Sequence, residues 1–182
     1  LVRNLKTNLE EEIIISEEKV ISPGINLMQK DRNTDILRIG YDSPKTPSRV
    51  YEYNVVTKEK KLVKELQIPS GYNRDDYVVS RINCDGHDGR KIPLTITHHK
   101  KTKLDGSAHL LLYGYGSYGY SVSSNFSSNR LSLIDRDIIW ATAHIRGGME
   151  RGMKYWEEGK MLNKKNTFKD YISCAKFLIN KK

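Results

Sequence analysis

The sequence predicts an α/β fold that is preceded by a run of all-β strands. Residues 1–66 contain short, alternating apolar runs separated by polar turns, which is the pattern of half-buried strands. Residues 109–112 and 138–145 are strand-like runs that each end in a glycine loop. Residues 168–179 then carry apolar side chains at the i, i+3, i+4 spacing of an amphipathic helix. Strands followed by alternating strand and helix are typical of the α/β class.

The first 66 residues are interpreted as β-strands throughout. The expected strands are 12–16, 19–22, 36–41, 50–55 and a return strand at Leu62 and Val63. Pro23-Gly24 is interpreted as a sharp break, residues 43–48 as a loop, and residues 56–60 as a polar hairpin tip. Such strands fit either a β-sandwich or a propeller blade, and their periodicity does not distinguish the two.

Residues 68–71 are interpreted as a linker to the second region. Its expected strands are 77–82, 92–97, 109–112 and 138–145, the first two forming an antiparallel pair around a turn at 84–90. Residues 126–136 are interpreted as helix or coil, and residues 153–158 as a short helix. Asn166 is the expected N-cap of a final helix. The predicted buried face of that helix consists of Phe168, Tyr171, Ile172, Ala175, Leu178 and Ile179.

Composition excludes few classes of protein. The formal net charge of +9 admits an anionic partner, but the lysines are scattered and no nucleic-acid motif accompanies them. No apolar stretch approaches membrane-spanning length, and no metal or cofactor site is evident. Cys84 and Cys174 lie far apart, which favours reduced thiols and a cytoplasmic protein.

The two glycine loops and their flanks carry a family resemblance. Residues 112–119 read Leu-Tyr-Gly-Tyr-Gly-Ser-Tyr-Gly, residues 143–148 read Ala-His-Ile-Arg-Gly-Gly, and residues 164–171 read Lys-Lys-Asn-Thr-Phe-Lys-Asp-Tyr. In order and spacing these motifs resemble the prolyl oligopeptidase family of serine peptidases, and within it oligopeptidase B. The resemblance implies that residues 1–66 end a β-propeller and that residues 67–182 form the first half of an α/β-hydrolase catalytic domain. It also implies a serine oligopeptidase that cleaves short peptides after basic residues.

The catalytic triad is expected to lie outside this chain. An α/β-hydrolase carries its nucleophile on a Gly-x-Ser-x-Gly elbow, and the sequence contains none. Ser117 comes nearest, but Tyr115 stands where the first glycine belongs. By resemblance, the serine, aspartate and histidine would all follow Lys182, so the chain is expected to be inactive alone. The alternatives are one half of a split enzyme, completed by a partner polypeptide, and a non-catalytic basic binding module.

Two residues are candidates for the remaining part of the site. The resemblance implies that the Tyr115 hydroxyl helps to hold the oxyanion, whereas Tyr113 is expected only to pack. It also implies that Glu150 selects arginine or lysine before the cleaved bond, although Arg151 beside it could neutralise the carboxylate. Two further family positions that are commonly acidic are Ser123 and Asn125 here, which weakens the case for a second basic subsite. His144 is expected to be structural.

Overall fold

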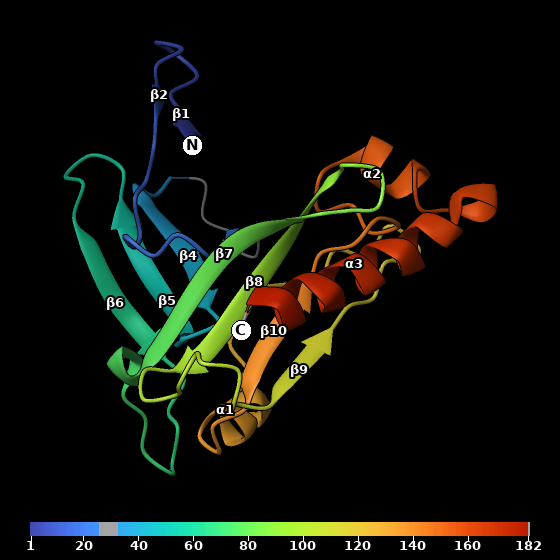
Figure 1. Ribbon diagram of the computed structural model, residues 1–182. Coiled ribbons are helices and arrows are strands. Elements are labelled where there is room, and N and C mark those ends of the chain that lie inside the picture. The colour runs from blue at the N-terminus through green and yellow to red at the C-terminus, as the bar shows by residue number, and fades with distance from the viewer. Residues whose placement is uncertain (26–32, 182) are drawn as a thin grey trace.

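The computed structural model describes residues 1–25 and 33–181, which form two four-stranded sheets and one small ribbon (Figure 1). The ribbon pairs β1 (Val2–Arg3) with β2 (Glu10–Glu11). The first sheet has the order β3 (Ser22–Ile25), β4 (Ile36–Ser43), β5 (Thr46–Asn54) and β6 (Lys60–Glu65), all antiparallel. Each strand therefore pairs with its neighbour in the chain, as in a simple meander.

The first sheet corrects three expectations. Residues 12–21 form no strand, because no neighbouring strand pairs with them. Pro23 and Gly24 are not a break but lie inside β3, an edge strand that tolerates proline because one side of its backbone needs no partner. The expected loop at 43–48 shrinks to a turn at Pro44 and Lys45, and Pro47 enters β5 where the pairing with β4 shifts register.

The second sheet has the order β7 (Tyr77–Asp85), β8 (Lys91–His99), β10 (Ile139–Ala143) and β9 (Leu110–Tyr113). The expected antiparallel pair β7–β8 is confirmed, and β9 pairs parallel to β10. A 3-10 turn, η1 (Arg74–Asp76), precedes β7. Although β9 is an apolar run, Leu110 and Leu111 are 39% and 37% exposed. They are exposed because β9 is the edge strand of the sheet.

Helices pack on both faces of the second sheet. α1 (Ser128–Ile134) and α3 (Lys165–Lys181) are joined to the sheet through separate apolar clusters, while α2 (Met153–Glu157) and η2 (Met161–Asn163) precede α3. Trp140 packs with the α1 cluster and Ala143 with the α3 cluster. Because these two β10 residues are three positions apart, they face opposite sides of the sheet. Among the described residues, no helix is long and apolar enough to cross a membrane.

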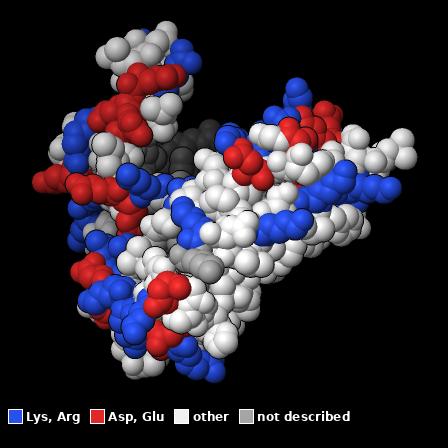
Figure 2. Space-filling view, in the orientation of Figure 1, with Lys and Arg blue, Asp and Glu red and all other residues white. Residues whose placement is uncertain are grey.

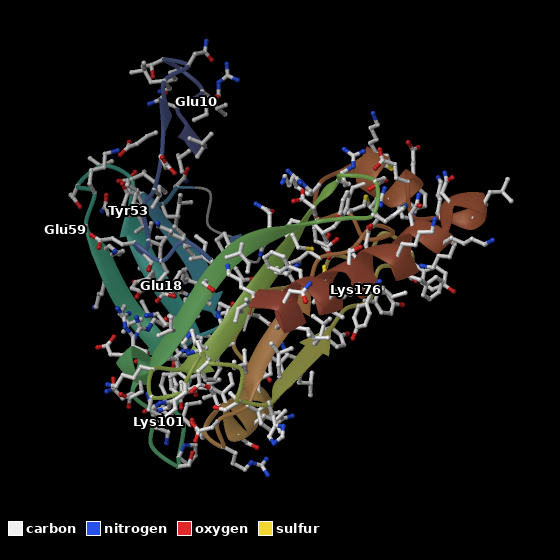
Figure 3. The ribbon with its side chains drawn as sticks, viewed as in Figure 1. Glu10, Glu18, Tyr53, Glu59, Lys101 and Lys176 are labelled. Atoms are coloured by element: carbon white, nitrogen blue, oxygen red, sulfur yellow. The ribbon has the colours of Figure 1, made fainter. Side chains whose placement is uncertain are left out.

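The final helix exists as predicted, but its buried face differs from the prediction. Phe168, Ile172 and Ile179 are 61%, 51% and 72% exposed. The fully buried positions are Thr167, Asp170 and Cys174, with Tyr171, Phe177 and Leu178 partly buried beside them. Lys176 lies on the exposed side of α3 (Figure 3).

Asn166 is not the N-cap of α3. The helix begins one residue earlier, at Lys165, so Asn166 lies in its first turn. Its side-chain amide donates a hydrogen bond to the carbonyl of Glu158 at 2.9 Å. The amide therefore ties the start of α3 to the end of the preceding α2 turn.

Candidate functional site

The two glycine loops meet at one edge of the second sheet. β9 and β10 are parallel, with Leu111 opposite Trp140, so the loops that follow them emerge at the same end. The backbone N–H of Gly119 donates to the carbonyl of Gly147 at 2.9 Å, and Gly119 also forms an isolated bridge with Gly148. The chain thus places residues 113–120 directly against residues 146–150.

Glycine is required where the two loops touch. Gly116 has a φ of +63°, and a Cβ there would lie 2.5 Å from the Thr167 methyl group. Gly147 has a φ of +95°, and a Cβ there would lie 2.1 Å from the Gly116 carbonyl oxygen. Both positions need a left-handed backbone conformation and space that no side chain leaves free.

A buried ion pair fixes the second loop to α3. Arg146 and Asp170 are 2% and 0% exposed, and the guanidinium donates to both carboxylate oxygens, at 2.8 Å and 2.6 Å. The backbone N–H of Arg146 also donates to this carboxylate at 3.2 Å. The hydrogen bonds that Arg146 donates to the Asp170 carboxylate raise the pKa of Arg146. This network was not predicted from the sequence, although Arg146 directly follows the expected strand 138–145 and Asp170 lies within the expected final helix.

The same guanidinium reaches a second carboxylate, that of Asp88, at 2.7 Å. Its hydrogen bond lowers the pKa of Asp88 to about 2. Potential metal-ligand atoms of His87, Asp88 and Asp170 lie within 4.8 Å of one another. The Arg146 guanidinium already supplies the positive charge between the two carboxylates, so the cluster is satisfied as an ion-pair network.

Lys164 holds the first loop, and Thr167 holds the second loop, against the start of α3. The Lys164 ammonium donates to the Gly116 carbonyl at 2.5 Å and to Ser117 Oγ at 2.7 Å. The Thr167 hydroxyl donates to the Arg146 carbonyl at 2.8 Å. Burial lowers the pKa of Lys164. Ser117 is therefore an anchor point of the loop in this arrangement.

The two tyrosines of the first loop differ in their surroundings. Tyr115 is 44% exposed, and its ring stands edge-on to Tyr120 with 5.6 Å between the centroids. Within residues 1–25 and 33–181, no group forms a hydrogen bond with its hydroxyl, which leaves that donor available to a ligand. Tyr113 instead ends β9, with its ring 6.1 Å from that of Trp140.

Glu150 is a buried carboxylate. Its side chain is 7% exposed, and Oε1 accepts the backbone N–H of Val122 at 2.9 Å. Oε2 is buried and has no hydrogen-bond partner among the described residues. Arg151, the neighbour that could neutralise this carboxylate, forms no ion pair with it among the described residues; its guanidinium donates to the Lys91 carbonyl at 2.8 Å.

His144 lies beneath this carboxylate. The ring is 1% exposed; Nδ1 is 3.7 Å from Glu150 Oε1, and Nε2 is 2.8 Å from the Thr95 hydroxyl. A ring enclosed in this way supports the site from inside the sheet and does not face solvent.

Ser123 and Asn125 lie in the segment between the first loop and α1. Ser123 Oγ is 3.2 Å from Ser22 Oγ in the first sheet, and Asn125 accepts the Arg130 guanidinium at 2.9 Å. A hollow beside them is lined by Tyr113, Tyr120, Val122, Ser123, Asn125 and Arg130. Its charged wall is thus basic.

Comparison with known proteins identifies the family. Residues 124–182 match the Prolyl oligopeptidase family. Dipeptidyl aminopeptidase BI of Pseudoxanthomonas mexicana is 38% identical over 98% of the chain and 24% of its own length. Protease 2 of Moraxella lacunata is 36% identical over 85% of the chain and 22% of its own length.

Solved structures agree with the sequence matches. Oligopeptidase B from Trypanosoma brucei, with covalently bound antipain, superposes with a TM-score of 0.84 at 36% identity, covering 91% of the chain and 24% of that protein. Oligopeptidase B from Leishmania major gives a TM-score of 0.83 at 35% identity, covering 91% and 23%. The two sheets with their glycine loops thus have the fold of the matching quarter of these oligopeptidase B structures. The chain belongs to the prolyl oligopeptidase family, and it spans about a quarter of the length of these relatives.

Proposed function

We propose that this chain is part of a serine oligopeptidase of the oligopeptidase B kind, which cleaves short peptides after basic residues. The observation that carries the proposal is the pairing of an available phenol and a buried carboxylate on two loops in contact. Tyr115 supplies the phenol and Glu150 the carboxylate. The names of the relatives, protease 2 and oligopeptidase B, support peptidase activity, and the preference for basic residues rests on Glu150.

The two sheets support a division of the chain at residue 66. Residues 1–66 include a four-stranded antiparallel meander, which is the form of a propeller blade. Residues 67–182 contain the mixed sheet with helices on both faces, which we assign to the first half of the hydrolase domain. In this assignment the blade borders the catalytic domain that holds the site.

Tyr115 would act on the transition state of acyl transfer. A neutral phenol on a rigid ring can donate a hydrogen bond to the oxyanion as negative charge develops there. The nucleophilic serine and its base come from residues outside this chain, either later in the same polypeptide or in a partner polypeptide. The substrates are short peptides, and the unbridged Cys84 and Cys174 favour the cytoplasm.

Glu150 would bind the basic side chain before the cleaved bond. A carboxylate can accept a guanidinium through two parallel hydrogen bonds, and an unpaired buried oxygen is costly until such a donor arrives. Movement of the segment at Val122, which is bonded to Oε1, would expose Oε2 to substrate. Ser123 and Asn125, beside Arg130, do not form an acidic second subsite, so we propose selection at one basic residue only.

The proposal is tested by turnover of a fluorogenic peptide with arginine before the cleaved bond. We expect turnover by the intact polypeptide that carries this sequence, or by its complex with a partner, and loss of turnover after treatment with a serine-directed fluorophosphonate. We expect none from residues 1–182 alone, since no nucleophile elbow occurs there. Turnover by residues 1–182 alone, or resistance of the intact enzyme to the fluorophosphonate, would contradict the proposal.

The substitution Glu150→Gln tests the specificity assignment. We expect kcat/KM for the arginine substrate to fall about 10- to 100-fold, because a hydrogen-bonded charge pair with substrate is lost. A substrate with a neutral residue at the same position should change little. The matched control is Glu157→Gln on the exposed side of α2, which should leave both substrates unaffected. An equal loss for both substrates would assign Glu150 to loop structure instead.

The alternative of a basic nucleic-acid module receives less support. Figure 2 shows acidic and basic side chains interspersed over the first sheet on the face in view, with a wide uncharged area beside them. A binding surface for a polyanion requires clustered basic residues.

A further inference from the structure

Two cysteines lie in contact in the core of the second sheet. Cys84 is on β7 and Cys174 is on α3, 90 positions apart in the chain, and their sulfur atoms are 3.2 Å apart. They are 1% and 0% exposed, and both are unbridged. We propose that Cys84 and Cys174 are a modification site, at which a hydroperoxide converts the thiol pair into a disulfide.

The geometry requires only a small displacement. Sulfur atoms in a disulfide are about 2.05 Å apart, roughly 1 Å closer than these two. Both thiols belong to the same apolar cluster, with Ile92, Leu94 and Ala143 around them. Packing therefore already holds the two side chains toward each other, and no strand or helix needs to be rebuilt.

The two thiols have unequal roles. The hydrogen bond from Cys174 lowers the pKa of Cys84, and the same interaction raises the pKa of Cys174. In this assignment Cys84 is the thiolate that attacks first and Cys174 is the thiol that resolves; the opposite order gives the same disulfide, because the two sulfur atoms are in contact. The charged groups that act on the pair are Asp85 and Asp170, which both oppose thiolate formation, and Arg146 neutralises Asp170.

The oxidation balances with one hydroperoxide. The Cys84 thiolate attacks a peroxide oxygen, the O–O bond breaks, and the leaving hydroxide takes a proton to become water, which leaves a sulfenic acid. The Cys174 sulfur then attacks the Cys84 sulfur and displaces hydroxide, which takes the Cys174 proton. Two thiols are oxidised, one hydrogen peroxide is reduced, and two waters form. Hydrogen peroxide is close to water in size, so a brief opening of the core admits it.

The disulfide would secure the helix that supports both glycine loops. Cys174 lies one turn after Asp170 on the buried face of α3, and Asp170 holds Arg146. Thr167, one turn earlier again, bonds the Arg146 carbonyl. A covalent link from α3 to β7 also closes a long loop, which restricts the unfolded chain.

The test is a peptide map of the intact polypeptide after treatment with hydrogen peroxide. Free thiols are alkylated under denaturing conditions, and the protein is digested with trypsin without reduction. We expect a cross-linked product that joins residues 82–90 to residues 170–176, and its loss after dithiothreitol. We also expect the melting temperature to rise by several degrees on oxidation and to return on reduction.

Matched variants complete the experiment. Cys84→Ala and Cys174→Ala should each abolish the cross-linked product and the reversible shift in melting temperature. The wild-type map decides the question even if a variant folds poorly. The proposal would be overturned if peptides 82–90 and 170–176 were both recovered in alkylated form. It would also be overturned if they were recovered as sulfinic or sulfonic acids and no cross-linked product formed. This result does not depend on peptidase activity, so its failure and that of the proposed function are distinguishable.

Discussion

Replacing Tyr115 by phenylalanine in the active enzyme should lower kcat about 100- to 1,000-fold, with little change in KM. The magnitude is that of losing one oxyanion donor. The ground-state carbonyl carries less charge than the transition state, so the missing hydrogen bond affects the chemical step more than substrate binding. The measurement is steady-state kinetics on the arginine peptide substrate.

Structure provides the control for this prediction. Tyr113→Phe removes the same atom two residues earlier, from a ring that lies near Trp140 at the end of β9, and should change kcat little. Neither variant should alter the melting temperature much, because Tyr113 and Tyr115 are 42% and 44% exposed and the Tyr115 hydroxyl bonds no described residue. An equal fall in kcat in the two variants, or a rise in KM with kcat unchanged, would show that Tyr115 does not donate to the oxyanion.

Local pattern predicted most elements of the second sheet. Alternation located the β7–β8 hairpin, and the two glycine-terminated runs located β9 and β10. Their parallel pairing brings the loops to one edge, so the position of the candidate site followed from where the strands end. Tyr115 and Glu150 remain predictions in their roles, because no contact within this chain tests them.

The wrong predictions concern positions whose burial or pairing depends on residues far away in the chain. The apolar spacing in 168–179 selected a stripe on α3 of which half is exposed and half only partly buried, while polar Thr167 and Asp170 are buried. These two are buried because Arg146 and its carbonyl, more than twenty residues earlier, satisfy them. Pro23 was likewise misread, since its place on an edge strand depends on strand order. Periodicity carries no information about such distant partners.

The Arg146–Asp170 pair leads to the largest expected effect on stability. We expect Asp170→Asn to reduce the free energy of unfolding by about 3–5 kcal/mol, since it leaves a buried guanidinium without its main counter-charge. Both groups are almost fully excluded from water, so solvent does not replace the lost partner. The amide also cannot accept from the guanidinium through two oxygens. Urea unfolding measures the loss of global stability. Hydrogen exchange of the 146–148 amides measures the local loss at the second loop.

Asp88→Asn is the matched control, because it removes a second carboxylate that the same guanidinium contacts. The Asp88 side chain is 40% exposed, so its loss should cost only about 0–1 kcal/mol. The pKa of Asp88 is lowered from 3.8 to about 2, so its contribution is present above pH 4 and fades as the pH falls toward 2. At neutral pH, Asp170→Asn should therefore lower the free energy of unfolding by more than Asp88→Asn does. If the two substitutions cost the same, burial is not what makes this pair important, and the loops are held mainly by Lys164 and Thr167.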